Sequence, residues 1–389
     1  MSGGIVQLVA TGAQDTWLTG NPEVSFFRSN YKRYTHYSAT NERQVIQGAP
    51  TAGSISTVRI EKKGDLLSYV YFMARDSNAA PIVNLNWANI IDKVELLIGG
   101  QVIDMHDLQY MTDVEPIVGA QTFNQRYLNS STLSTVGPQS TKATFLPLKF
   151  SFCKDWSVAL PLVALQYHDV ELRITWSTNL TTSTAGTEAV AGGATYANLQ
   201  YTCWANFVYL DQVERDFFAK KAHDMLITQV QRVPIGTAAM QELALAHPVK
   251  FLAWQSESYG AKYNNGAGSA NAVNYQLKVQ INGVDVGESR HLPAYVDVAQ
   301  YYHTQYGYVH NNGMANVAVI PYCLDTSKLQ PTGTLNFSRL DTYRLVVPPA
   351  LANGLKTLTN QAISPAYLYA VNYNVLRIQK GMGSVLYAS

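Results

Sequence analysis

The segment Val170–Trp176 constrains the fold of this chain more than any other stretch. Apolar and polar side chains alternate in it without interruption, with Val, Leu, Ile and Trp on one face and Glu, Arg and Thr on the other. A period of two residues is typical of a β-strand with one buried and one solvated face. Because such a strand needs a second layer over its apolar face, the sequence predicts a sandwich.

The residues that precede this strand are also apolar. Leu146–Phe152 is predicted to be an extended run that carries Phe150 and Phe152 and is broken only by Pro147. A turn and a second short apolar run, Val158–Leu165, then lead into the alternating strand. We therefore expect this region to be the centre around which the rest of the chain is organised.

Length and composition narrow the class of protein. A chain of 389 residues fits about two domains of ~150–200 residues each. Hydrophobic residues make up 47% and charged residues 14%, which argues against disorder. The formal net charge of +1 gives no support to direct nucleic-acid binding. Three widely spaced cysteines form neither a disulfide framework nor a zinc motif, and they fit a reducing compartment.

Tyrosine is unusually frequent, with 25 copies in 389 residues. Its ring covers apolar surface while its hydroxyl reaches a polar partner, which suits half-buried strands and protein–protein interfaces. The apolar runs are far shorter than the ~20 residues that span a bilayer. The N-terminus shows neither a signal peptide nor a myristoylation pattern, so we expect synthesis in the cytosol.

Two glycine-containing turns indicate that the chain repeats one structural plan. Gly99-Gly100 joins two alternating runs between Lys93 and Asp104, and Asn282-Gly283 joins two more between Tyr275 and Val286. Such dipeptides between alternating runs predict β-hairpins. Many short strands in two halves predict two antiparallel sandwiches in tandem.

The last strand is predicted over Tyr369–Ile378. Val371, Tyr373 and Val375 alternate there with Asn372 and Asn374. This pattern again predicts one apolar face and one polar face.

Residues 1–24 are interpreted as an N-terminal arm, because glycines interrupt any long period. Three apolar residues in it are spaced for one helical turn, and a small basic cluster among aromatic residues follows. An acidic protein or a membrane surface would attract such a cluster, whereas a solvated edge is the simpler interpretation. The side chains expected to contact a partner are Ile5, Leu8, Val9, Arg28, Lys32 and Arg33.

A helix is predicted between the two halves. Asp211 and Glu214 fit a capping box, and the helix that follows is expected to run for about three turns and to end near His223. The expected organisation is therefore an arm at 1–24, a first sandwich at 25–210, a linker helix at 211–225 and a second sandwich at 226–389.

Three His-Asp neighbours invite a catalytic interpretation: His106-Asp107, His168-Asp169 and His223-Asp224. Adjacent residues on a strand point to opposite faces, so such dipeptides rarely form a base and its orienting partner. The sequence contains no nucleophile elbow, no HExxH motif and no Walker loop. We predict no enzymatic activity, no cofactor and no metal.

Two alternatives from other classes stay open. A glycan-processing enzyme on the same fold needs paired carboxylates at one cleft, for which Asp65, Asp104 and Asp113 are candidates. A lectin-like module would instead use tyrosines to line a sugar site. The mass in solution separates both from an obligate oligomer.

Several motifs, in order along the whole chain, resemble the major capsid proteins of large eukaryotic DNA viruses such as phycodnaviruses and iridoviruses. The opening Gly3–Val9, Leu18–Pro22 and Tyr31–Tyr34 is similar to the start of these proteins, and Leu160–His168 is similar to their most recognisable internal motif. Further matching segments are Glu214-Arg215, Phe218-Ala219, Pro248–Lys250, Pro331–Thr334, Asn336–Arg339, Ala370–Arg377 and Gly381–Gly383.

This resemblance implies an all-β double jelly roll, that is, two tandem eight-stranded jelly-roll sandwiches with short helices in the connections. It further implies homotrimeric, pseudo-hexagonal capsomers that tile an icosahedral shell, so that the protein is made in the host cytoplasm and resides in the virion. The implied partners are other copies of the chain, minor capsid and penton proteins, and an internal viral membrane beneath the arm, with no direct contact to nucleic acid.

Overall fold

The computed structural model describes residues 3–75, 87–119, 145–181, 196, 199–236, 238–256, 276–305, 316–347 and 367–387. The chain divides into two compact units, Met1–His36 and Tyr37–Ser389, which we describe separately.

The amino-terminal unit contains two short helices, α1 (Gly3–Val9) and α2 (Thr16–Thr19). The predicted apolar helical turn is confirmed, because Ile5, Leu8 and Val9 all lie in α1. Neither helix buries a residue, and residues 21–36 contain no helix or strand. This unit therefore has no hydrophobic core of its own.

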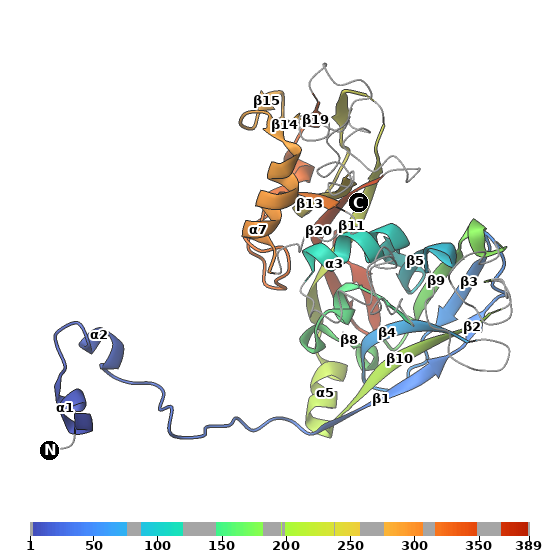
Figure 1. The fold of residues 1–389 in the computed structure, drawn as a ribbon. Coiled ribbons are helices and arrows are strands. Elements are labelled where there is room, and N and C mark those ends of the chain that lie inside the picture. Colours follow the sequence, from blue (N-terminus) through green and yellow to red (C-terminus); the bar gives the residue numbers. More distant parts are fainter. Residues whose placement is uncertain are drawn as a thin grey trace. The chain divides into compact units, whose positions relative to one another are not determined.

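The first sandwich consists of two antiparallel sheets (Figure 1). Sheet A has the order β1 (Tyr37–Gln44), β10 (Gln200–Leu210), β4 (Leu66–Arg75) and β7 (Phe145–Pro147), with β8 (Leu160–Pro161) also paired to β4. Sheet B has the order β2 (Ile46–Gln47), β3 (Ile55–Arg59), β9 (Val170–Trp176), β5 (Ile91–Ile98) and β6 (Gln101–Asp107).

The strand β9 confirms the alternation read from the sequence. Val170, Leu172, Ile174 and Trp176 are at most 1% exposed and face the core, whereas the residues between them are half-buried. The indole Nε1 of Trp176 donates to Ser56 Oγ on the neighbouring strand at 2.7 Å. The buried polar tip of this large ring is therefore satisfied.

The extended run predicted over Leu146–Phe152 is wrong beyond its first residues. The strand β7 ends at Pro147, which has no N–H to donate to the ladder, and a 3-10 turn follows at Ser151–Cys153. The turn brings Phe150 and Phe152 together in the core, with ring centroids 6.2 Å apart.

The second sandwich repeats the strand order of the first. Sheet C has the order β11 (His223–Pro234), β20 (Tyr367–Gln379), β13 (Pro248–Ser256) and β17 (Asn316–Pro321), with β18 (Leu335–Asn336) and β21 (Met382–Val385) beside it. Sheet D has the order β12 (Met240–Glu242), β19 (Tyr343–Val346), β14 (Gln276–Ile281) and β15 (Val284–Asp285), with β16 (Arg290–His291) paired to β14. In both sandwiches the first strand pairs with a long strand near the end of the domain, β1 with β10 and β11 with β20, so the fold is a double jelly roll, as the resemblance implied.

Both predicted hairpins are confirmed. Gly99 and Gly100 have φ of 59° and 81°, and Asn282 and Gly283 have φ of 49° and 79°. Two consecutive positive φ angles are the geometry of a type I′ turn, which suits the twist of paired strands. A side chain at Gly99 would also place its Cβ 2.4 Å from the His168 ring.

The predicted linker helix is α5 (Gln212–Lys220). Asp211 is its N-cap, but its carboxylate accepts from the N–H of Gln212 rather than from that of Glu214, so the predicted capping box is not formed. The helix ends at Lys220, and His223 already belongs to β11.

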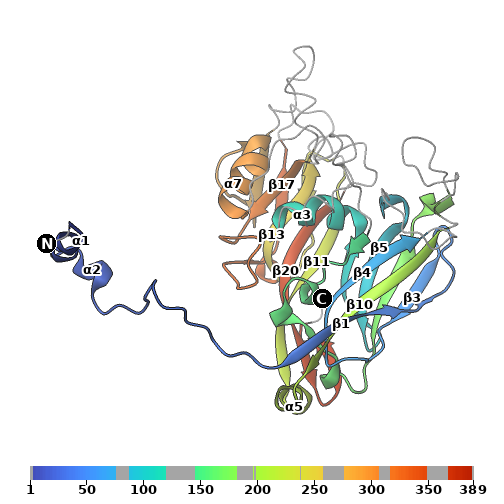
Figure 2. The same cartoon turned by 60° about the horizontal axis from the view of Figure 1, so that its bottom comes forward.

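The polar face predicted for the last strand is wrong, because β20 is buried on both faces. Asn372 is 0% and Asn374 is 4% exposed. Their amides are paired inside the protein: Gln231 Nε2 donates to Asn372 Oδ1, and Asn374 Nδ2 donates to Gln229 Oε1, each at 2.8 Å. The burial arises because β11 and β20 run between the first sandwich and the rest of the second (Figures 1 and 2).

Candidate assembly interface

The two jelly rolls meet through the outer face of sheet C. One face of this sheet, with Leu252, Trp254 and Ala370, belongs to the core of the second sandwich. The opposite face, with Phe251 and Tyr369, belongs to the same hydrophobic cluster as the first sandwich. Sheet C is therefore the wall between two cores.

The part of the first sandwich that covers sheet C is β6 with the helical turns after it, η2 (Tyr110–Val114, a π-helical turn) and α3 (Glu115–Val118). The ring of Tyr110 lies 5.5 Å from that of Tyr369, and all four residues of α3 are buried. Gln109 Nε2 donates to Gln255 Oε1 at 3.2 Å across the same contact.

A network of buried hydrogen bonds joins the first sandwich to sheet C at this contact. Asp107 accepts from the hydroxyl of Tyr369 at 2.8 Å and from the N–H of Tyr110 at 2.9 Å, and Arg232 lies 3.3 Å away. Burial raises the pKa of the Asp107 carboxyl, and these three donors lower it in part. Asp104 accepts from the N–H of Val230 at 2.9 Å.

The His-Asp dipeptides do not form catalytic dyads. His106 lies against Asp104, two residues away on the same strand, at 2.9 Å, and its ring stacks on Phe150 inside the core, where no substrate reaches it. His168 Nδ1 lies 3.0 Å from the carbonyl of Gly383, and His223 Nε2 lies 2.8 Å from that of Phe218.

Their aspartate neighbours pair elsewhere, Asp169 with Arg59 and Asp224 with Arg377.

The carboxylates considered for glycan chemistry do not form a pair in the described structure. Asp65 lies 3.0 Å from Arg215 at the start of α5 and accepts from the N–H of Leu210, whereas Asp104 lies in the contact between sandwiches. The side chain of Asp113 lies outside the described residues. The described residues also contain no group of three His, Cys, Asp or Glu side chains arranged to hold a metal ion.

The outer face of sheet A corresponds to the outer face of sheet C. Among the described residues, however, no element covers the outer face of sheet A. A groove of about 650 Å³ runs over it. Tyr69 packs edge-on against Trp156 at 5.8 Å, and Tyr71 packs edge-on against Phe145 at 5.9 Å. These aromatic side chains are half-buried or exposed, which marks an apolar surface without its cover.

The second sandwich carries a matching counterpart of the covering element. Its π-helical turn η9 (Ala294–Val298) leads directly into α7 (Ala299–His303), as η2 leads into α3. Ala299 and Gln300 fix α7 to the sandwich, since Gln300 Nε2 donates to the carbonyl of Val317 at 2.7 Å. On the outside, Tyr301 is 75% and Tyr302 is 72% exposed.

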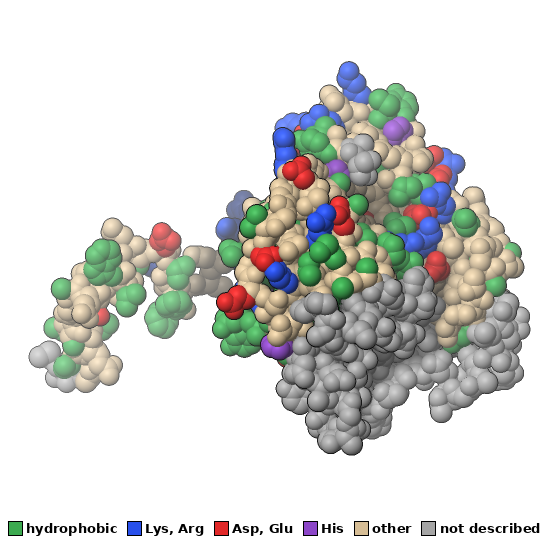
Figure 3. All heavy atoms as spheres, turned by 90° about the horizontal axis from the view of Figure 1, so that it is seen from above, with side chains coloured by type: hydrophobic (Ala, Val, Ile, Leu, Met, Phe, Trp, Pro, Cys, Tyr) green, Lys and Arg blue, Asp and Glu red, His purple; other side chains and the backbone are tan. Residues whose placement is uncertain are grey.

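The predicted partner-contact residues all lie in the amino-terminal unit. Ile5, Leu8 and Val9 are exposed on α1, and Arg28, Lys32 and Arg33 are exposed in the segment before β1. Large apolar side chains such as Trp17 and Phe27 are also exposed there, and Figure 3 shows hydrophobic side chains along this unit. The described helices include none long and apolar enough to cross a membrane.

Sequence reasoning did not single out Trp156, Tyr301, Tyr302 or the buried Lys250. The excess of tyrosine was the available signal for the aromatic surfaces, but it gives no positions. For Lys250 the signal was a lysine inside an apolar strand.

Comparison with known proteins agrees with these observations. A family model described as "Major capsid protein N-terminus" matches residues 25–211, and one described as "Large eukaryotic DNA virus major capsid protein" matches residues 214–384. The major capsid protein of Paramecium bursaria Chlorella virus 1 is 33% identical, and that of Pyramimonas orientalis virus is 32% identical, each over 100% of both chains. The chain belongs to the major capsid proteins of the large eukaryotic DNA viruses.

Solved structures support the same assignment. The quasi-atomic model of the PBCV-1 virus capsid matches this capsid protein with a TM-score of 0.70 and 27% identity, covering 94% of this chain and 100% of that chain. The resemblance read from the motifs is thereby confirmed. As a major capsid protein, the chain is a structural component of the virion and associates with further copies of itself.

Proposed function

We propose that three copies of this capsid protein form a pseudo-hexagonal capsomer that tiles an icosahedral shell. One observation carries the proposal: the described residues form two equivalent covering elements and two equivalent sheet faces, and among these residues one such pair meets while the other stays open. The turns η2 and α3 cover sheet C, while the exposed tyrosines of α7 and the outer face of sheet A have no cover in the described part of the chain.

The open pair fits a second copy. If α7 of one copy packs on sheet A of the next, the contact joins two different surfaces of the protein. Such a head-to-tail contact either closes into a ring or continues as an open filament. Three chains with two sandwiches each supply six similar wedges, which close a ring with threefold symmetry. Aromatic residues such as Tyr301 and Trp156 suit the centre of such an interface.

Light scattering tests the assembly. The wild type is expected to have about three times the mass of one 42.9 kDa chain and to stay trimeric on dilution. Replacing both exposed tyrosines of α7 with Glu is expected to give folded monomers, because two carboxylates would be buried in an apolar groove. The matched control is Tyr301→Phe with Tyr302→Phe, which keeps the rings and the trimer. A wild type that is a stable monomer at micromolar concentration contradicts the trimer, and a trimeric double-Glu variant contradicts this interface.

We further propose that the protein has no enzymatic role. The support is that His168 and His223 each lie against a backbone carbonyl and that their aspartate neighbours pair with arginines. His168→Ala and His223→Ala are therefore expected to lower stability or assembly and to alter no turnover. An activity screen that found hydrolysis by the wild type, abolished by either substitution, would show that this assignment is wrong.

The amino-terminal arm is proposed to bind the layer beneath the capsomer, where minor capsid proteins, penton proteins and an internal membrane are the candidate partners. Support comes from its exposed apolar helix α1 and from Arg28, Lys32 and Arg33, because a segment without its own core folds stably only against a partner. Near an anionic bilayer each cation contributes ~1 kcal/mol.

Deleting residues 2–24 tests the arm. The truncated protein is expected to form soluble trimers with a nearly unchanged Tm, since α1 and α2 bury no residue, yet to assemble shells poorly or wrongly. Early unfolding of the trimers would place the arm in a core, and normal shells would make it dispensable. Flotation with anionic vesicles, compared between the full chain and the truncation, separates a membrane partner from a protein partner.

A further inference from the structure

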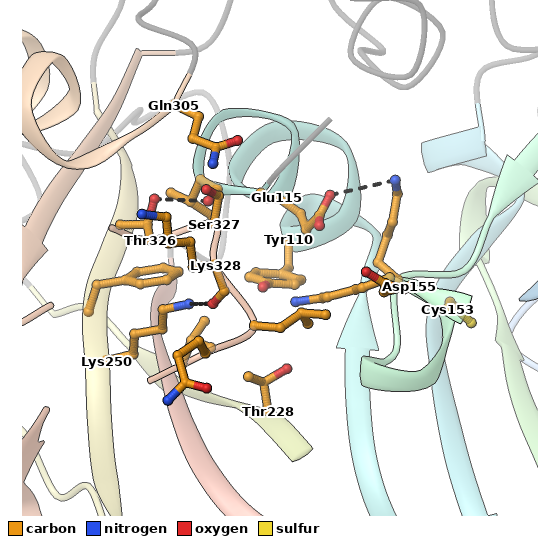
Figure 4. A pocket seen from close by; sticks show the side chains of 18 residues that line it. Tyr110, Glu115, Cys153, Asp155, Thr228, Lys250, Gln305, Thr326, Ser327 and Lys328 are labelled. Carbon is orange, nitrogen blue, oxygen red and sulfur yellow. Dashed lines mark hydrogen bonds and ion pairs between the residues drawn. The ribbon is translucent and has the colours of Figure 1, made fainter. Parts of the chain in front are cut away.

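A cavity of about 370 Å³ lies inside the contact between the two jelly rolls (Figure 4). The first sandwich lines it with Lys149 and Lys154, and the second sandwich lines it with Lys250 and Lys328. Among the described residues that line it, two carry a carboxylate, Glu115 and Asp155. The wall of the cavity therefore carries an excess of positive charge.

Lys250 is the least expected of these cations, because its residue is only 3% exposed. Its Nζ donates to the carbonyl of Lys328 at 2.9 Å and lies 5.6 Å from the ring centre of Tyr373. An ammonium group has three N–H donors, and among the described residues no carboxylate lies within ion-pair distance of this one. A buried charge normally has a counterion, so this one calls for an anion.

The other lysines show where that anion would lie. Lys149 is 3.8 Å from Glu115 and Lys328 is 3.8 Å from Asp325, so each has a carboxylate nearby. Lys154 has no ion pair in the described part of the chain, and its charge acts on Lys250 from across the cavity. Burial first and Lys154 second lower the pKa of Lys250 to about 8. Two like charges thus face one space.

We propose that this cavity binds a small polyanion with two or more linked phosphate groups, which bridges Lys154 of the first jelly roll and Lys250 of the second. A single phosphate is too small to fill a cavity of about 370 Å³, whereas a short phosphate chain offers several anionic groups to the two ammonium groups in the lining. The hydroxyl of Thr228 on β11 lines the same cavity (Figure 4). The bound anion replaces the repulsion between the sandwiches with two attractions.

Titration calorimetry on the full chain tests the site, with sodium tripolyphosphate as the probe at constant ionic strength. The wild type is expected to bind tripolyphosphate more tightly than orthophosphate. Lys154→Gln, at an exposed position that does not threaten folding, is expected to raise the Kd at least tenfold, and so is Lys250→Met. The matched control is Lys220→Gln on α5, which removes an exposed lysine outside the cavity and leaves the Kd within twofold.

Three comparisons of affinity test the proposal. The proposed site would be wrong if Lys154→Gln and Lys220→Gln lost affinity for tripolyphosphate equally, or if Lys154→Gln lost none. Either result would mean that the probe only screens surface charge. Tighter binding of citrate than of tripolyphosphate would overturn the phosphate assignment. A nucleoside triphosphate that binds more tightly than tripolyphosphate identifies a nucleotide as the source, and equal affinity identifies an inorganic phosphate chain.

The pH dependence supplies an independent readout. The charged or titratable groups that act on Lys250 are Lys154, Cys323 and Asp325, with the ring of Tyr373 beside it. Since the pKa of Lys250 is about 8, affinity for tripolyphosphate is expected to fall between pH 7 and pH 9. Lys250→Met should lose this part of the pH dependence, because the titration of the probe itself is common to both proteins. An identical profile in the two proteins would remove Lys250 from the site.

Discussion

Sheets A and C are built in the same strand order, yet their outer faces differ. On sheet C the outer face is covered by the first jelly roll, and Tyr369 and Val371 there are fully buried. On sheet A the outer face carries Tyr69 and Tyr71, half-buried at the edge of an open groove. In the proposed trimer the chain therefore uses one interface twice, once closed within itself and once with another copy.

The difference between these two outer faces shows that strand order does not decide whether a sheet face is buried. On β20 the side chains of both faces are apolar or paired, as Asn372 shows, so the strand tolerates complete burial. On β4 only one face is fully buried, and the other carries tyrosines, whose rings accept both water and a protein partner. In the proposed trimer, side-chain chemistry thus distinguishes a contact within the chain from one that forms on assembly.

The largest expected effect on stability comes from truncating a side chain in the interface that is closed within the chain. Tyr369→Ala removes a fully buried ring and its hydroxyl, and is expected to lower the free energy of unfolding by about 3–5 kcal/mol. Tyr71→Ala in the open groove should cost less than about 1 kcal/mol. Both are measured by denaturant titration in the variant with Glu at both α7 tyrosine positions, where the groove is unoccupied. Equal losses at the two positions would contradict the division into closed and open faces.

A smaller effect comes from the cation that sheet C buries. Lys250→Met is expected to stabilise the protein by about 2 kcal/mol at pH 7 in phosphate-free buffer, because burial lowers the pKa of the lysine to about 8. Between pH 8 and the ordinary lysine value of 10.5 the unfolded chain binds more protons than the folded one, so the wild type gains stability as pH rises. The advantage of the variant should shrink across that window. A difference that stays constant from pH 7 to pH 10 would show that the lysine is neutral or already paired.

The smallest effect isolates one hydroxyl. Tyr369→Phe keeps the ring but removes the donor to Asp107, which is expected to cost about 1–2 kcal/mol because the acceptor is a buried carboxylate. The matched change Tyr71→Phe should be neutral within about 0.5 kcal/mol. Thermal denaturation of the same monomeric background measures both. A neutral Tyr369→Phe would mean that the other donors to Asp107 suffice.

Local patterns predicted much of this fold. The alternation of Val170–Trp176, the glycine turns and the repeated strand plan follow from short-range rules, and the structure confirms them. The burial of Asn372 could not be predicted, because its amide pairs with Gln231 on a strand that is distant in the sequence. The burial of Lys250 could not be predicted either. It coincides with a shift in strand register between Val249 and Phe251. The contacts of the arm stay predictions.

In each sandwich the first strand pairs with a long strand near the end of the domain, and this pairing has a consequence for synthesis. Tyr37 pairs with Leu210, and His223 pairs with Ile378. Contacts between residues so far apart in sequence form late, because the intervening chain must exist before they close. A nascent chain that has been synthesised beyond Lys220 contains every described strand of its first sandwich. The surface that sheet C will cover is then still exposed to solvent. One that stops before Tyr367 lacks the central strand of its second sandwich, so the ribosome must nearly finish the protein before its two halves can join.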